Sequence, residues 1–154
     1  MSLKLKDLQD LVEAKAKEYA EPMDCLPAVL HAVNDALKDV DEINYTDPMV
    51  LKAASPLPMG FGAYDGPCGA FTAGSLAIGL KYGTADQKDR KTIQSVMSRS
   101  RDWANWFRYI KFGSTNCTVM RGNPPTFSHC VDYVAQSSGK LVDILTEENS
   151  KVIR

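Results

Sequence analysis

Apolar residues recur at spacings of three and four along most of this chain, and no segment alternates apolar and polar residues as a half-buried β-strand does. A repeat of this length is typical of α-helices with one buried face. The pattern predicts helices over about residues 4–20, 25–38, 47–54 and 67–82, a long one from 84 or 86 to 112, and a last one from 128 that frays over 147–154. We therefore expect an all-α, single-domain bundle of about six helices.

Length and charge narrow the possible functions. The chain has 154 residues and no internal repeat or linker, so residues 1–154 are expected to form one domain. A formal net charge of −1 argues against nucleic-acid or acidic-membrane partners. No apolar run reaches the roughly 18 residues of a membrane span. The N-terminal residues lack the apolar core of a signal peptide, which favours the cytoplasm unless a leader has been removed.

Four cysteines are dispersed along the chain, at positions 25, 68, 117 and 130. No two are closer than 13 positions, so the chain contains no CxxC pair of the kind found in zinc fingers, nor a CxxCH haem-attachment motif. A domain of this size needs no disulfides to be stable. Taken alone, such cysteines are most often small buried hydrophobic residues.

Three of these cysteines, however, fall at predicted helix starts. Cys25 follows the capping residue Asp24, Cys68 follows Pro67, and Cys130 lies in the first turn of the last helix, whereas Cys117 is expected in a loop after Gly113. Free N–H groups and the helix dipole favour negative charge at a helix start. Such positions lower the pKa of a cysteine and favour the thiolate, which is both nucleophile and metal ligand.

Glycine and alanine surround Cys68 in the stretch 60–74. Gly66 and Gly69 flank this cysteine, and we expect them to let the main chain approach a thiolate-bound group so that N–H groups can point at sulfur. Gly74 and Gly79 are better explained by close helix packing. The segment 60–62 is not a phosphate loop, because no Gly-Lys-Ser/Thr sequence follows it.

The remaining chemistry-bearing residues favour structural roles. His129, beside Cys130, is a candidate ligand but more often such a histidine caps a helix or faces solvent, and His31 lies off the apolar stripe. The aromatic residues between Trp103 and Tyr109 are expected in the core or in an oligomer contact, which makes a homodimer a prediction. No Ser–His–acid set and no pair of catalytic carboxylates is recognisable, so no catalytic residue is assigned.

The cysteine-containing segments together resemble the C_GCAxxG_C_C family of redox-active proteins, over roughly residues 20–145. The segment 24–30 (DCLPAVL) is similar to the family's first cysteine motif, the stretch through Cys68-Gly69-Ala70 and on to Gly83 to its central signature, and 112–117 (FGSTNC) to its Phe-Gly-Ser-x-x-Cys motif. Cys130 supplies the last cysteine. The chain also resembles the cluster-carrying domain of split-Soret cytochrome c.

This resemblance implies an iron–sulfur centre, most simply [2Fe–2S], held by Cys25, Cys68, Cys117 and Cys130. Haem binding is not implied, because the attachment motifs are absent. The chain departs from the family label where Pro67 replaces a glycine before the cysteine and where the closing glycine is Gly74. These differences concern the helix after Cys68 rather than the four thiols.

Three functional hypotheses remain open at this point. The first is an electron-transfer or redox protein that binds an iron–sulfur cluster and exchanges electrons with an unknown partner protein. The second is thiol–disulfide chemistry, with Cys117 and Cys130 as the pair nearest in sequence and Cys68 as the best-activated thiol. The third is a structural-metal or plain helical binding module.

Overall fold

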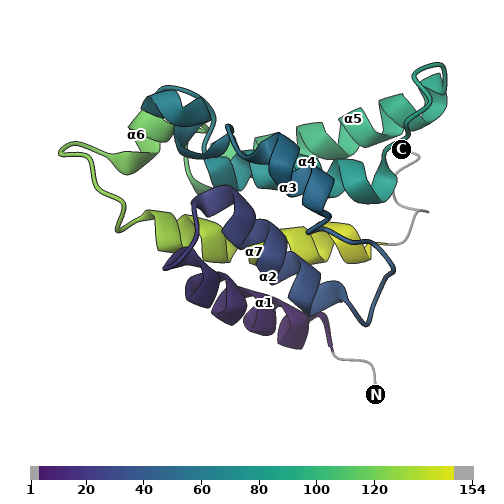
Figure 1. Ribbon diagram of the computed structural model, residues 1–154, viewed down its shortest axis with the longest axis horizontal. Coiled ribbons are helices and arrows are strands. Elements are labelled where there is room, and N and C mark those ends of the chain that lie inside the picture. Colours follow the sequence, from purple (N-terminus) through teal and green to yellow (C-terminus); the bar gives the residue numbers. More distant parts are fainter. Residues whose placement is uncertain (1–3, 148–154) are drawn as a thin grey trace.

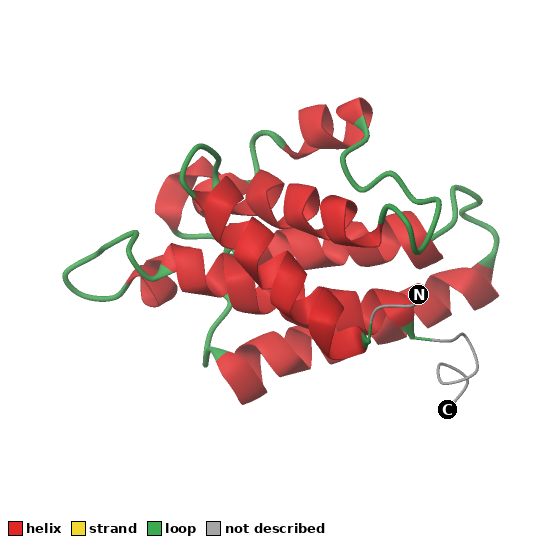
Figure 2. Ribbon diagram, turned by 90° about the horizontal axis from the view of Figure 1, so that it is seen from below, coloured by secondary structure: helices red, strands yellow, loops and turns green. Residues whose placement is uncertain are grey.

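The computed structural model describes residues 4–147, and this part of the chain consists of helices joined by loops, without a β-strand (Figure 2). Six helices have seven residues or more, as predicted, and they form an all-α bundle (Figure 1). They are α1 (Leu5–Ala20), α2 (Cys25–Leu37), α3 (Pro48–Ala54), α4 (Gly69–Tyr82), α5 (Arg90–Asn105) and α7 (Cys130–Thr146).

The bundle has two layers. Helices α1, α2 and α7 pack against one another, and α4 lies across α2 and α7 with α5 on its outer side (Figure 1). The core between them is aliphatic, with Leu26, Leu30, Val33, Leu141 and Leu145 almost completely excluded from solvent. In Figure 1, α2, α4 and α7 all begin at the same end of the molecule, the end at which α6 also lies. This arrangement brings residues that are far apart in sequence to one place.

The long helix begins later than predicted. Asp89, not Thr84 or Asp86, caps α5, because the Asp89 side chain accepts a hydrogen bond from the backbone N–H of Thr92 at 3.1 Å. Residues 84–88 instead form turns in which Thr84 and Asp86 bind nearby backbone amides. The helix then continues as a π-helix, η2 (Trp106–Lys111), and ends before Gly113, whose φ of +80° breaks it as expected.

Two short elements were not predicted from the sequence. A kinked turn with non-helical backbone at Phe61 and Gly62, η1 (Gly60–Tyr64), and a short helix, α6 (Cys117–Arg121), lie together at the end of the bundle where α2, α4 and α7 begin (Figure 1). The segment around η1 contains Met59, Phe61 and Tyr64 at positive φ, a backbone conformation that non-glycine residues rarely adopt. Strained backbone of this kind is found preferentially at functional sites.

The aromatic residues of α5 and η2 are mostly part of the core. Trp103 and Phe107 are fully buried, and the Trp103 indole N–H donates a hydrogen bond to the carbonyl of Phe71 at 3.0 Å. A β-carbon on Gly74 would overlap the Trp103 ring, so this glycine serves helix packing as expected. Gly79 has open space around it and takes part in no close packing.

The oligomer prediction therefore loses part of its basis. Trp106 is partly buried against the core, whereas Tyr109 and Ile110 are exposed on the outer face of η2. The homodimer stays a prediction.

Within residues 4–147, no helix combines the length and the apolar character that a membrane span would need.

Candidate functional site

All four cysteines lie at helix N-termini. Cys25, Cys117 and Cys130 are the first residues of α2, α6 and α7, and Cys68 immediately precedes α4 as its capping residue. The sequence predicted this position for three of them. The expectation of a loop at Cys117 was wrong, because Asn116 starts a helix there by accepting a hydrogen bond from the N–H of Val119.

A short piece of antiparallel pairing joins the Cys68 and Cys117 segments. The N–H of Cys68 donates to the carbonyl of Thr115 at 2.6 Å, and the N–H of Cys117 donates to the carbonyl of Gly66 at 2.8 Å. The pair between these two bonds, Pro67 and Asn116, forms an isolated β-bridge. Pro67 fits there because its position in the pairing requires no N–H donor.

This pairing directs both thiols to the same side. Neighbouring side chains on an extended segment point to opposite faces, so Cys68 and Cys117 share the face that Pro67 and Asn116 do not occupy. Gly66 lies directly opposite Cys117 in the pairing. A β-carbon on Gly66 would nevertheless meet Gly60 and Phe61 first, rather than that thiol.

Gly69 has a direct role at the site. A β-carbon on this residue would overlap the Sγ atom of Cys25 and would lie 3.2 Å from the backbone nitrogen of Leu26. The start of α4 can approach the Cys25 thiol because it has no side chain at this point. The sequence predicted that Gly69 lets the main chain approach a bound group; the approach seen here is to the Cys25 thiol, and the contact with a bound group stays a prediction.

Gly66 allows close packing of the backbone next to Cys117. A β-carbon on Gly66 would lie 2.8 Å from the carbonyl oxygen of Gly60, and one on Gly60 would lie 2.9 Å from the β-carbon of Cys117. Gly60 also has a φ of +61°. The two glycines therefore let η1 and the Cys68 segment pack against each other beside Cys117, and Gly66 does not itself face a sulfur atom.

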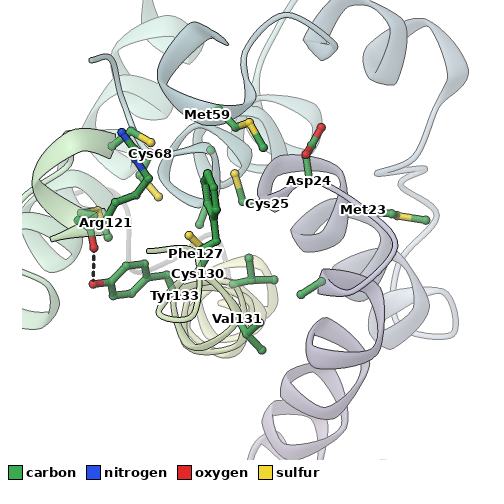
Figure 3. A pocket seen from close by; sticks show the side chains of 16 residues that line it. Met23, Asp24, Cys25, Met59, Cys68, Arg121, Phe127, Cys130, Val131 and Tyr133 are labelled. Atoms are coloured by element: carbon green, nitrogen blue, oxygen red, sulfur yellow. Dashed lines mark hydrogen bonds between the residues drawn. The ribbon is translucent and has the colours of Figure 1, made fainter. Parts of the chain in front are cut away.

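The four cysteines line one pocket with a cavity of about 190 Å³. A single water molecule needs only about 10–15 Å³, so the cavity is much larger than one ion requires. In Figure 3, the side chains of Cys25, Cys68 and Cys130 are grouped with Phe127, Tyr133 and Arg121 around it. The remaining lining residues are Ala20, Met23, Asp24, Met59, Gly69, Ala70, Cys117, Met120, Val131 and Val134.

Burial dominates the electrostatics of the thiols. It raises the pKa of Cys68 to about 12 and that of Cys130 to about 11, and it also raises the pKa of Cys25. The cysteines act on one another as well: a negative charge on Cys25 raises the pKa of both Cys68 and Cys130. The lowered thiol pKa expected from the helix starts is therefore wrong for these three, because desolvation outweighs the helix dipole.

Hydrogen bonds from backbone N–H groups nevertheless lower the pKa of two of the thiols. The amides of Met59 and Leu26 lower the pKa of Cys25, and those of Ala70 and Phe71 lower the pKa of Cys68, each against the larger effect of burial. The Met59 amide reaches Cys25 from a residue with a φ of +58°. The strained backbone before η1 thus presents a donor to the pocket.

One cation and one acidic side chain line the pocket within residues 4–147. Asp24 is exposed at its rim, whereas the guanidinium of Arg121 lowers the pKa of Cys130 against the effect of burial. The Nε atom of Arg121 is buried and has no hydrogen-bond partner in this part of the chain. Arg121 was not predicted as a site residue, because it lies in α6, the helix that was not predicted.

The histidines do not belong to the site. His129 is exposed, does not line the pocket and faces the ring of Tyr133 at a centroid distance of 6.3 Å. His31 packs on Tyr19 at 5.3 Å. Tyr133 does line the pocket, and its hydroxyl donates a hydrogen bond to the carbonyl of Met120 at 2.9 Å (Figure 3).

The thiols do not form a closed site for a single ion. Among the described residues, no group of three or more histidine, cysteine, aspartate or glutamate side chains is placed to hold one metal ion. The four cysteines are free, without a disulfide between them. They nevertheless share one cavity.

Comparison with known families gives a match over most of this region. Residues 23–144, which include all four cysteines and the whole pocket apart from Ala20, match the family described as "Putative redox-active protein (C_GCAxxG_C_C)". The chain belongs to the C_GCAxxG_C_C family. This agrees with the resemblance found in the sequence and with a redox function as its general class.

The other comparisons give no match to this C_GCAxxG_C_C protein. Neither a curated protein nor a solved structure matches the chain. The resemblance to the split-Soret cytochrome domain is therefore not confirmed, and the properties of the site follow from its own residues.

Proposed function

We propose that this C_GCAxxG_C_C protein is an electron-transfer protein that binds a [2Fe–2S] cluster through Cys25, Cys68, Cys117 and Cys130. The observation that carries the proposal is the convergence of all four thiols on one cavity from the starts of four different helices. When bound, such a cluster accepts one electron and returns it to a partner protein.

The residues of the pocket fit a group of this kind. A cluster with four thiolate ligands carries net negative charge, and helix N-termini favour negative charge. The amides of Met59, Leu26, Ala70 and Phe71 act on two of the sulfur atoms, and Arg121 has a buried N–H without a partner. Most of the lining is apolar, and Cys68 and Cys117 are buried within it.

The size of the cavity favours a cluster over a zinc ion. Four sulfur atoms around one zinc lie within about 4 Å of one another, given Zn–S bonds of about 2.3 Å. No such group is present among residues 4–147. A cluster with two iron atoms spreads its four ligands over a larger volume, and the cavity of about 190 Å³ provides that volume.

The pKa values argue against thiol–disulfide exchange as the function. The attacking group in exchange is a thiolate, and an efficient attacking thiol has a pKa near the ambient pH. Burial instead raises the pKa of Cys68, the thiol expected to be best activated, to about 12. In a metal-free pocket this thiol is protonated and a poor nucleophile.

Anaerobic reconstitution tests the proposal. We expect protein incubated with ferrous iron and sulfide to become coloured and to bind iron and sulfide in equal amounts, about two of each per chain for [2Fe–2S]. Reduction with dithionite should give an electron paramagnetic resonance signal. Cys25→Ala, Cys68→Ala, Cys117→Ala and Cys130→Ala should each reduce the bound iron.

Other outcomes decide between the alternatives. A colourless protein that binds no iron under these conditions contradicts the proposal. Retention of one zinc ion after purification, with unfolding on chelation, would instead support the structural-metal alternative. Circular dichroism of each alanine variant distinguishes loss of a ligand from loss of the fold.

A further inference from the structure

Arg121 is the one cation that lines the cysteine pocket within residues 4–147. Its position at the end of α6 places it four residues after Cys117, on the same helical face. It makes no salt bridge with a described carboxylate, so its charge is not neutralised by the surrounding protein.

Two aromatic rings hold the guanidinium in place. Its central carbon lies 4.4 Å from the centroid of the Tyr64 ring and 5.6 Å from that of Phe127, and the two rings are 6.3 Å apart. Stacking of this kind fixes an arginine without neutralising it. Phe127 lines the pocket itself and appears beside the cysteines in Figure 3.

The buried Nε atom of Arg121 has no acceptor within the protein. A buried donor without a partner is costly, because it has lost its hydrogen bonds to water. An anionic group in the pocket, with sulfur atoms as acceptors, would supply the missing partner. The unneutralised charge and the unpaired donor thus both indicate a negative occupant.

We propose that Arg121 is a positioning residue for the redox group, one that raises its reduction potential by stabilising the additional negative charge of the reduced state. This inference rests on the proposed function. In the step concerned, the group gains one electron from a reduced electron-carrier protein, no bond is formed or broken, and no proton moves. Arg121 interacts more strongly with the more negative state, and the equilibrium shifts toward reduction.

The test is a spectroelectrochemical titration of the reconstituted protein. A positive charge that lines the pocket interacts more favourably with the reduced state, because that state carries one more negative charge. We therefore expect Arg121→Gln to lower the equilibrium constant for reduction about tenfold, which is about 59 mV for one electron. Arg121→Lys, which keeps the charge, should restore most of the potential.

Arg108→Gln is the matched control. Arg108 also stacks on a tyrosine, Tyr109, at 5.5 Å, but it is exposed and does not line the pocket. Its replacement removes the same charge and should leave the potential unchanged. If Arg121→Gln does not fold, Arg121→Met keeps an unbranched apolar stem between the rings and is titrated in its place.

The outcomes separate this inference from the proposed function. A cluster that assembles in wild-type protein and keeps its potential in Arg121→Gln overturns the inference alone. Equal shifts in Arg121→Gln and Arg108→Gln also overturn it, because the effect would then be one of overall charge. Failure of the wild-type protein to bind a cluster overturns the proposed function, and the inference with it.

Discussion

The sulfur atom of Cys25 occupies the space that a side chain on Gly69 would need. These two residues are separated by more than forty positions in the sequence and belong to the first turns of α2 and α4. Their contact fixes the distance between two of the four cysteine-containing segments, since Cys68 precedes Gly69 directly. The position of the Cys25 thiol in the pocket therefore requires a glycine at position 69.

Replacement of this glycine should damage the site more than the fold. In Gly69→Ala, the new methyl group would collide with Cys25 Sγ, and we expect the thiol to move out of the pocket. Alanine itself favours a helix over glycine by roughly 0.5–1 kcal/mol, which offsets part of the strain. The expected result is a folded protein with at least a several-fold loss of bound iron after reconstitution, measured by iron and sulfide assay.

Gly79→Ala provides the control for this prediction. Gly79 lies in the same helix, and apart from the adjacent backbone of that helix no atom lies within 4 Å of the position of its missing β-carbon. The substitution should leave iron binding unchanged and stabilise the protein by roughly 0.5–1 kcal/mol. Equal iron binding by both variants would show that the contact between Gly69 and Cys25 has no role in the site.

A second glycine in α4 affects stability alone. In Gly74→Ala, the methyl group would overlap the indole ring of Trp103, which is fully buried and hydrogen-bonded to Phe71. Overpacking of this kind destabilises by about 1–3 kcal/mol. Urea denaturation should show this loss, while the folded fraction keeps its capacity for iron. Unchanged stability would mean that α4 and α5 can separate freely at this point.

The main helices could be predicted from the sequence because each has its own apolar face and end signals. Helices α1 and α2 begin within about one residue of the predicted positions. The start of α5 was placed too early because Thr84, Asp86 and Asp89 are all capping residue types, and only the folded chain shows that Asp89 binds the Thr92 amide. Local sequence does not distinguish a cap from a turn.

The sequence predicted that the four cysteines come together, but it did not predict the residues that surround them. The grouping was predicted from their positions at helix starts and from the family resemblance, whereas their role as ligands and the role of Gly69 toward a bound group stay predictions. The short helix α6 has five residues and too little periodicity to be recognised, so Arg121 and the Asn116 cap were missed. The raised pKa values of Cys68 and Cys130 depend on burial, which is a property of the assembled bundle.

Asn116 caps α6, the helix that begins with Cys117, so its replacement should affect both stability and the site. The Asn116 side chain accepts from the Val119 N–H at 3.3 Å and donates to Asp65 at 3.2 Å. In Asn116→Ala we expect a loss of about 1 kcal/mol in the free energy of unfolding, together with weaker iron binding because Cys117 begins the helix that this cap holds. Both quantities can be measured on one preparation.

A cap outside the site serves as its control. The side chain of Asp47 accepts from the N–H of Met49 at 2.9 Å at the start of α3, and Asp47 does not line the pocket. Asp47→Ala should reduce stability by a similar amount and leave iron binding unchanged. If the two variants reduce iron binding equally, the effect of Asn116→Ala comes from general destabilisation rather than from Cys117.

The raised thiol pKa values predict how the metal-free protein responds to alkali. Burial raises the pKa of Cys68 from 9.0 to about 12 and that of Cys130 to about 11, so the folded chain keeps protons that the unfolded chain releases above pH 9. The free energy of unfolding therefore keeps the full contribution of these buried thiols below pH 9. It declines as the pH rises from 9 toward the thiol pKa values of the folded chain. For the buried Cys68 the slope approaches about 1.4 kcal/mol per pH unit.

Urea denaturation of metal-free protein at pH 8, 9, 10 and 10.5 measures this dependence. Because lysine and tyrosine side chains also titrate in this range, the comparison is with Cys68→Ala, which removes one thiol and keeps the other groups. The variant should lose less stability than wild type between pH 9 and 10.5, since its pocket holds one fewer buried thiol to ionise. Parallel curves for the two proteins would mean that Cys68 ionises as readily in the folded chain as in the unfolded one. Burial would then not be what keeps this thiol protonated in the metal-free protein.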